Sequence, residues 1–232
     1  MKTTTIDEHP LRIPLGAVTI DADLTLPEHA AGLVLFAHGS GSSRFSPRNR
    51  HVARQLNEAG LATVLADLLT PAEEAVDERT RQLRFDIGML GERLVGVTDW
   101  LGRQPPTTPL PVGYFGASTG AGAALVAAAQ RPDAVRAVVS RGGRPDLADE
   151  ALPEVRAPTL LIVGGNDVPV IGMNRQALAR LSCEKQLVIV PGATHLFEEP
   201  GTLDAVATLA RDWFLRHLAY RGTGGSMGAS RT

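Results

Sequence analysis

Short uninterrupted apolar runs are the feature of this sequence that most restricts its fold. From Gly32 onward they alternate with longer amphipathic stretches, and strands of this kind are buried on both faces by the helices that connect them. The runs predict strands at residues 33–37, 62–66, 112–115, 134–139, 159–163 and 186–190. The sequence therefore predicts an α/β domain around a mostly parallel central sheet.

The remaining segments predict the helices and one antiparallel edge. Two alternating segments before Pro27, residues 12–20 and 23–26, are typical of an antiparallel pair at the edge of a sheet. No linker or repeat divides the chain, so we expect a single domain over residues 1–221 and a flexible tail, GTGGSMGASRT, over residues 222–232. Amphipathic stretches predict helices at about residues 47–59, 78–101, 119–130, 171–181 and 203–220.

Composition excludes several classes of function. The 232 residues include 23 Lys and Arg against 25 Asp and Glu, a net charge of −2 without any basic run, which argues against nucleic-acid binding. The single cysteine, Cys183, can form neither an internal disulfide nor a cysteine-rich zinc site. The first ten residues lack the apolar stretch of a secretory signal, and no segment has the composition of a spanning helix. We therefore expect a cytoplasmic protein that does not bind a membrane.

A serine follows the third of the predicted strands. The segment Gly116-Ala117-Ser118-Thr119-Gly120 lies between strand 112–115 and an alanine-rich helix, which is the context that the G-x-S-x-G motif requires. Glycines on either side let the strand and the helix approach closely around a strained serine. The motif predicts Ser118 as a nucleophile; the alternative is a packing turn of small residues.

A serine hydroxyl needs a base, and the base needs an acid that orients it. Asp167 follows strand 159–163, and His195 follows strand 186–190. The carboxyl ends of parallel strands meet at one edge of the sheet. We therefore predict a catalytic triad of Ser118, Asp167 and His195 that needs no metal and no cofactor.

The loop after strand 33–37 is a candidate for the oxyanion hole, which needs backbone donors near the nucleophile. Its sequence is His38-Gly39-Ser40-Gly41-Ser42. We expect the N–H of Thr119 as the first donor and that of Ser40 as the second, with Gly41 as the alternative to Ser40.

Four segments carry a family resemblance: FAHGSGSS (36–43), GYFGASTG (113–120), LLIVGGND (160–167) and VPGATHLFEEPG (190–201). The sequence resembles the α/β-hydrolase superfamily, in particular the small dienelactone-hydrolase-like group, from about residue 12 to residue 220. The resemblance implies an α/β-hydrolase fold with helices on both faces of the sheet. It also implies that the four segments supply, in turn, oxyanion donors, nucleophile, acid and base. Dienelactone hydrolases proper carry a cysteine where this chain has Ser118.

Substrate size and charge are suggested by two further features. Residues 140–157 are too few to insert the cap domain found in many relatives, so we expect an open groove for small esters or lactones. Arg44 and Arg141 follow predicted strands, where a guanidinium could bind a substrate carboxylate. The alternative for both is solvation or an ion pair with Asp67, Asp86 or Asp146.

These observations predict a serine hydrolase that cleaves small carboxylic esters or lactones through an acyl-enzyme. A thioesterase, a peptidase or an acyltransferase would use the same triad, and a non-catalytic protein that binds a small ligand is a further alternative. The sequence leaves the physiological substrate and the oligomeric state open.

Overall fold

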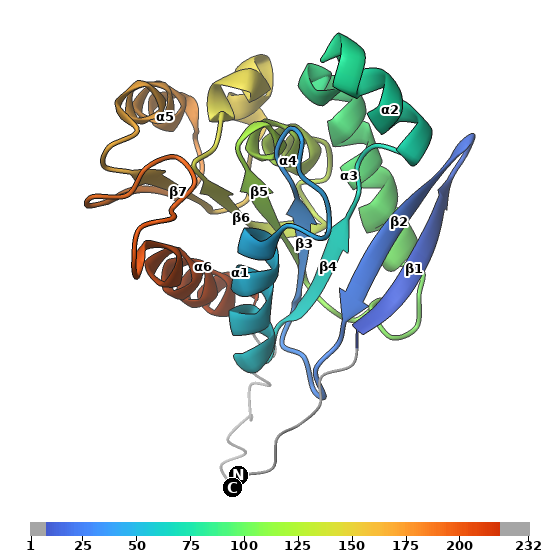
Figure 1. The fold of residues 1–232 in the computed structure, drawn as a ribbon. Coiled ribbons are helices and arrows are strands. Elements are labelled where there is room, and N and C mark those ends of the chain that lie inside the picture. Colours follow the sequence, from blue (N-terminus) through green and yellow to red (C-terminus); the bar gives the residue numbers. More distant parts are fainter. Residues whose placement is uncertain (1–7, 219–232) are drawn as a thin grey trace, which may run out of the picture.

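A single eight-stranded sheet forms the centre of the computed structural model, which describes residues 8–218 (Figure 1). The strand order is β1-β2-β4-β3-β5-β6-β7-β8; β3 to β8 are parallel, and β1 and β2 form an antiparallel edge. The strands are β1 (Glu8–Leu15), β2 (Val18–Thr25), β3 (Leu33–Ala37), β4 (Ala62–Ala66), β5 (Val112–Ala117), β6 (Val135–Arg141), β7 (Thr159–Gly164) and β8 (Lys185–Val190). The predicted mostly parallel sheet with an antiparallel N-terminal edge is confirmed.

Helices cover both faces of this sheet (Figure 1). Because successive side chains of a strand point to opposite faces, Leu33 and Leu35 of β3 join one apolar core, and Val34 and Phe36 join the other. Helices α3 and α4 pack on the first core, and α1 and α6 pack on the second. The helices are α1 (Pro47–Glu58), α2 (Pro71–Thr80), α3 (Ile87–Leu101), α4 (Thr119–Gln130), α5 (Val168–Arg180) and α6 (Thr202–Leu218), with 3-10 segments at Leu83–Phe85 and Pro145–Glu154.

The predicted helix at 78–101 is wrong, because the chain breaks there into α2 and α3. Arg81 ends α2 with a left-handed φ of 56°. Asp86 then begins α3 by accepting a hydrogen bond from the N–H of Met89. Charged residues continue through the break, so hydrophobic periodicity alone does not reveal these two caps.

The predicted strand at 12–20 is also wrong in extent. β1 ends at Leu15, a two-residue turn follows, and Val18 of β2 pairs with Leu15. Gly16 makes this turn possible with a φ of +64°, a conformation that favours glycine. The alternation of apolar residues continues across so short a turn, which hides it in the sequence.

Only the 3-10 segment Pro145–Glu154 separates β6 from β7, so the described residues contain no cap domain, as predicted. Within residues 8–218, no helix has the length and apolar character to cross a membrane.

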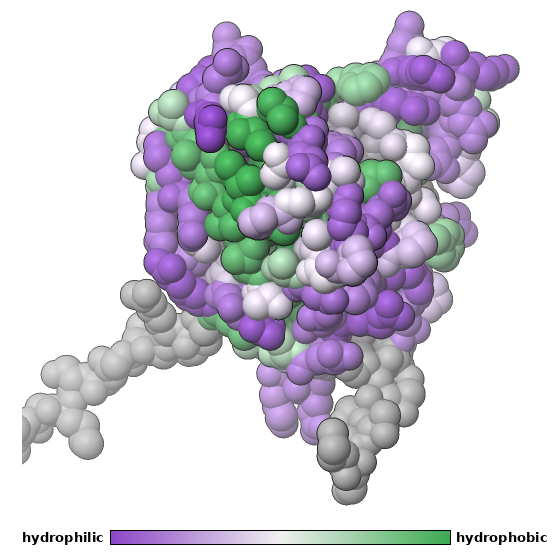
Figure 2. Space-filling model, turned by 60° about the vertical axis from the view of Figure 1, so that its left-hand side comes forward, coloured by the Kyte–Doolittle hydropathy of each residue, from purple (hydrophilic) through white to green (hydrophobic). Residues whose placement is uncertain are grey.

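Strand β8 is the other edge of the sheet, and Ile189 on it is exposed. The side of the molecule that Figure 2 brings forward has an apolar area bordered by polar side chains. The predicted tail at 222–232 lies outside the described residues.

Candidate active site

Ser118 occupies a sharp turn between β5 and α4. Its backbone has φ 50° and ψ −123°, which is rare for a residue other than glycine. Glycines on both sides allow the close approach: a Cβ on Gly116 would lie 2.4 Å from the Cα of Ala121, and one on Gly120 would lie 2.2 Å from the carbonyl oxygen of Ala37. The backbone therefore has the shape of a nucleophile elbow.

His195 and Asp167 form a hydrogen-bonded pair next to this turn. The Nδ1–H of His195 donates to Oδ2 of Asp167 at 2.7 Å. Asp167 precedes α5, yet its side chain makes no capping hydrogen bond to that helix, so its carboxylate is directed to the histidine instead. The pair leaves Nε2 of His195 to act as an acceptor.

The chain at the carboxyl end of β6 contacts both the serine and the histidine. The N–H of Ser118 donates to the carbonyl oxygen of Arg141 at 3.3 Å. The next residue, Gly142, lies against the histidine, since a Cβ there would be 3.6 Å from Cε1 of His195. Thus the last residue of β6 and the residue after it contact two of the three predicted triad members.

The loop at residues 38–42 packs directly on the elbow. A Cβ on Gly39 would lie 2.9 Å from the Cβ of Ser118. We expected the N–H of Ser40 to be an oxyanion donor. It donates to Oγ1 of Thr119 at 3.1 Å, and the hydroxyl oxygens of Ser40 and Thr119 are 2.9 Å apart. The Thr119 side chain thus connects the elbow to the loop. Sequence reasoning missed this contact, for which the only signal is a hydroxyl residue directly after the serine.

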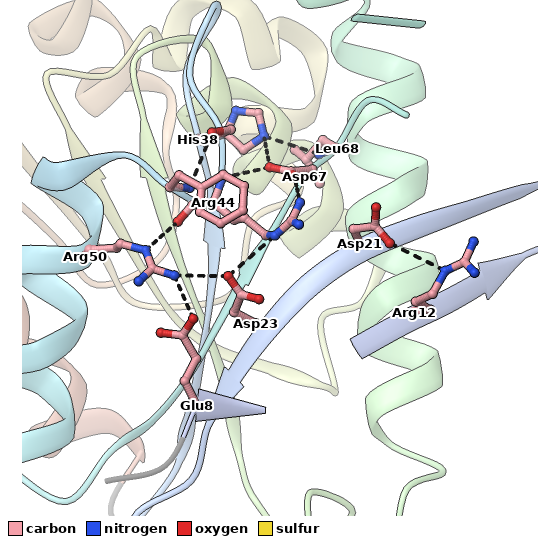
Figure 3. A network of polar contacts seen from close by, with 11 residues as sticks. Glu8, Arg12, Asp21, Asp23, His38, Arg44, Arg50, Asp67 and Leu68 are labelled. Carbon is pink, nitrogen blue, oxygen red and sulfur yellow. Dashed lines mark hydrogen bonds and ion pairs between the residues drawn. The ribbon is translucent and has the colours of Figure 1, made fainter. Parts of the chain in front are cut away.

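His38 fixes the start of this loop. Its Nδ1–H donates to the carbonyl oxygen of Gly39 at 3.1 Å, and its Nε2 accepts the N–H of Leu68 at 3.3 Å (Figure 3). Burial lowers the pKa of His38, which favours the neutral ring that this pair of contacts requires. The imidazole is therefore a structural connection between the loop and the end of β4.

Arg44 forms ion pairs instead of standing free at the site. Its guanidinium pairs with Asp67 and lies 3.5 Å from Oδ2 of Asp23, while its backbone N–H donates to Asp67 at 2.7 Å (Figure 3). The ion pair with Asp67 was the alternative to the predicted contact with substrate. These two carboxylates leave little positive charge for a substrate.

Arg141 differs from Arg44. Its side chain is 7% exposed, and its Nη2 donates to Oδ1 of Asn49 on α1 at a long 3.4 Å. No carboxylate among the described residues lies within ion-pair distance of it. Two of the carboxylates considered as its partners are engaged elsewhere: Asp146 pairs with Arg144, and Asp86 caps α3.

A cavity of about 140 Å³ adjoins the loop at residues 38–42 and Thr119. Helix α2 contributes Glu74, Asp77 and Glu78 to its wall. Not all charges of this helix are solvated, because Asp77 is buried and pairs with Arg84. A larger cleft of about 790 Å³ lies at the opposite, amino-terminal ends of β5, β6 and β7 and includes none of the predicted site residues.

Residues 8–218 contain no group of three or more side chains suited to hold a metal ion.

Known proteins resemble this chain over most of its length. Residues 20–220 match the model of the dienelactone hydrolase family. A crystal structure of dienelactone hydrolase from Anabaena variabilis is 64% identical, with a TM-score of 0.90 over 92% of this chain and 99% of that one. Est1E from Butyrivibrio proteoclasticus is 16% identical with a TM-score of 0.76, over 91% of this chain and 99% of its own, and shares the fold.

Curated relatives from Mycobacterium tuberculosis carry a different name. Two proteins called "Putative phosphoribosyl transferase" are 59% identical over 218 residues, which is 94% of this chain but 48% of theirs. The chain thus spans about half the length of these relatives. The family match covers nearly all of the described fold, with the serine elbow and the Asp–His pair inside it. The chain belongs to the dienelactone hydrolase family.

Proposed function

We propose that this protein is a serine hydrolase that cleaves small carboxylic esters or lactones through an acyl-enzyme on Ser118. The observation that carries the proposal is the 2.7 Å hydrogen bond between Asp167 and His195 beside a serine in an elbow conformation. An imidazole held in this way presents Nε2 as a base, which a serine hydroxyl needs in order to act as a nucleophile at neutral pH.

The reaction follows from these groups. Nε2 of His195 takes the proton of the Ser118 hydroxyl as Oγ attacks the carbonyl carbon of the ester, and Asp167 stabilises the imidazolium that results. The protonated histidine then gives the proton to the leaving alcohol, and the acyl group remains on Ser118. A water molecule, activated by the same histidine, releases the acid and restores the enzyme.

The oxyanion of the tetrahedral intermediate needs backbone donors. The N–H of Thr119, at the first position of α4, has no helical carbonyl to bond to and is the first donor. The N–H of Ser40 is the second donor if the oxyanion replaces Oγ1 of Thr119 as its acceptor. Gly41 remains the alternative to Ser40.

The open architecture supports small substrates. Only the 3-10 segment Pro145–Glu154 stands between β6 and β7, and the cavity beside the oxyanion loop has a volume of about 140 Å³. A lactone or a short-chain ester suits a space of that size better than a long acyl chain.

The tuberculosis relatives named "Putative phosphoribosyl transferase" are about twice as long as the segment that matches this chain. We propose that the half shared with this chain carries the hydrolase chemistry. A thioesterase, a peptidase or an acyltransferase would use the same residues and differ in the leaving group or the acceptor.

The test is pre-steady-state hydrolysis of a short-chain nitrophenyl ester, with mass spectrometry of the quenched protein. The native protein should give a burst and an acyl adduct on Ser118, and Ser118→Ala should give neither while its circular dichroism spectrum stays unchanged. Cys183→Ser is the matched control, because this half-buried thiol donates a hydrogen bond to Thr159 and packs against the core, outside the proposed triad, and it should keep the burst. A burst of native size in Ser118→Ala would refute the proposal.

A further inference from the structure

Arg141 is a buried cation without a counter-charge. The residue is 7% exposed, and its Nε has no hydrogen-bond partner among the described residues. Burying a charge is expensive unless it is paired, and within residues 8–218 the only polar contact of this guanidinium is the neutral amide of Asn49 at 3.4 Å. An anion at this position would remove the imbalance.

A second arginine increases the positive charge at the same place. Burial first, and then the positive charge of Arg48, lower the pKa of Arg141 to about 10. The Nε of Arg48 is buried without a partner as well. Its Nη1 reaches Oε1 of Glu198 at 3.3 Å, and the Glu198 side chain is 63% exposed. So exposed a pair contributes little binding free energy, and an incoming anion can displace the glutamate.

The start of α1 adds a backbone contribution. The helix begins at Pro47, so Arg48 and Asn49 lie in its first turn. N–H groups of the first turn have no helical acceptor and give this end of the helix a partial positive charge. Ser46 caps the N–H of Asn49, which leaves the N–H of Arg48 available to an anion.

We propose that Arg48, Arg141 and the first turn of α1 form a binding site for a small oxyanion, with a phosphate group as the ligand. Phosphate carries three terminal oxygens and up to two negative charges, so one group can bridge two guanidinium forks and a backbone N–H. The charge of a phosphate dianion balances the two arginines once Glu198 has moved aside.

This site adjoins the elbow but is separate from the triad. The carbonyl oxygen of Arg141 accepts the N–H of Ser118, and Gly142 lies against the ring of His195. The phosphate can therefore come from two sources: it is a substituent of the ester substrate, or it is a free ion that binds beside the catalytic loop. Binding of the anion does not depend on the proposed ester hydrolysis.

Isothermal titration calorimetry with inorganic phosphate, at constant ionic strength in a chloride buffer, tests the site. We expect saturable binding to the native protein and at least tenfold weaker binding to both Arg141→Gln and Arg48→Gln. Arg180→Gln is the matched control, because Arg180 forms only an exposed pair with Asp149, and it should bind phosphate as the native protein does. Arg48 is partly exposed, so its variant keeps the test valid even where Arg141→Gln fails to fold.

Kinetics then separate the two sources. If the phosphate belongs to the substrate, kcat/KM should be higher for an ester that carries a phosphate group than for its neutral analogue, and Arg141→Gln should lose this preference. If the phosphate is a free ion, added phosphate should change the rate at which the native protein hydrolyses the neutral ester. It should not change that rate for the arginine variants. Absence of saturable phosphate binding, or equal binding by the native protein and both arginine variants, overturns the site whatever the result for Ser118.

Discussion

Ser118 keeps a backbone conformation that costs about 1–3 kcal/mol for a residue with a side chain. Three hydrogen bonds hold it: its N–H donates to Arg141, and its carbonyl oxygen accepts the N–H groups of Ala121 and Arg144 at 3.1 and 2.9 Å. Strand β6, helix α4 and the segment after β6 thus fix one residue from three directions. These bonds fix the backbone that carries the hydroxyl.

Thr119 determines how the neighbouring loop is held. Its Oγ1 accepts the N–H of Ser40 and contacts the Ser40 hydroxyl. Thr119→Val removes both contacts at nearly constant volume, and hydrogen bonds of this kind contribute about 1 kcal/mol each. We expect kcat for a nitrophenyl ester to fall about 3- to 10-fold, while Thr119→Ser, which keeps the hydroxyl, stays within about twofold. A faster Thr119→Val enzyme would contradict this, because it would mean that competition of the hydroxyl for the Ser40 N–H costs more than its hold on the loop contributes.

At the scale of elements, the approach of α4 to the sheet depends on Gly120. A Cβ there would lie 2.2 Å from the carbonyl oxygen of Ala37 and 2.5 Å from that of His38. Gly120→Ala must push α4 away from β3, so we expect a loss of more than about 2 kcal/mol in the free energy of unfolding, together with most of the activity. Urea denaturation measures the first effect.

Gly172→Ala is the matched control for this change. Gly172 lies in α5, and a Cβ there would meet no atom within 4 Å. Alanine is the better helix former by up to about 1 kcal/mol, so this variant should be at least as stable as the native protein. Equal losses in the two variants would show that close approach is not what Gly120 provides.

Elements differed in how far the sequence could predict them. The bounds of β3 and β4 follow from uninterrupted apolar runs, because both faces of these strands are covered. The break between α2 and α3 could not be predicted, since it depends on caps and on the buried Asp77–Arg84 pair. In the site, the order of motifs predicted which strand ends carry Ser118, Asp167 and His195. It could not predict the partners of Arg44 and Arg141, which come from residues distant in the sequence.

Helix α2 is attached to α3 by an ion pair that makes stability depend on pH. Hydrogen bonds from Arg93 lower the pKa of Glu73 from 4.5 to about 2, so Glu73 binds a proton more readily in the unfolded chain. Its contribution is therefore complete above about pH 4.5 and is lost as the pH falls toward 2. Between pH 5.5 and 2.5 the native protein should lose about 2 kcal/mol more than Glu73→Gln, measured by urea denaturation. Glu78→Gln, an exposed change on the same helix, should follow the native curve.

At the scale of the whole molecule, a chain of polar contacts joins the antiparallel edge of the sheet to Arg44, just after the loop at residues 38–42 (Figure 3). Arg50 of α1 donates to Glu8 of β1 at 2.7 Å and to Asp23 of β2 at 3.2 Å, and its Nε donates to the carbonyl oxygen of Arg44 at 3.2 Å. Burial raises the pKa of Asp23, which shows that this carboxylate is poorly solvated and depends on its arginines. Arg50 thus connects one edge of the sheet with the segment that leads out of the loop at residues 38–42.

Arg50→Gln tests this connection. Losing the shared partner of Glu8 and Asp23 should lower the free energy of unfolding by about 1–2 kcal/mol, because Asp23 is only 7% exposed. Hydrogen exchange should become faster in β1, in β2 and at residues 39–44, and stay unchanged in β6 to β8. Arg180→Gln, which loses one exposed pair, should change neither quantity by a measurable amount. If exchange accelerated in β1 and β2 while residues 39–44 kept their native rates, the edge of the sheet would be uncoupled from this loop.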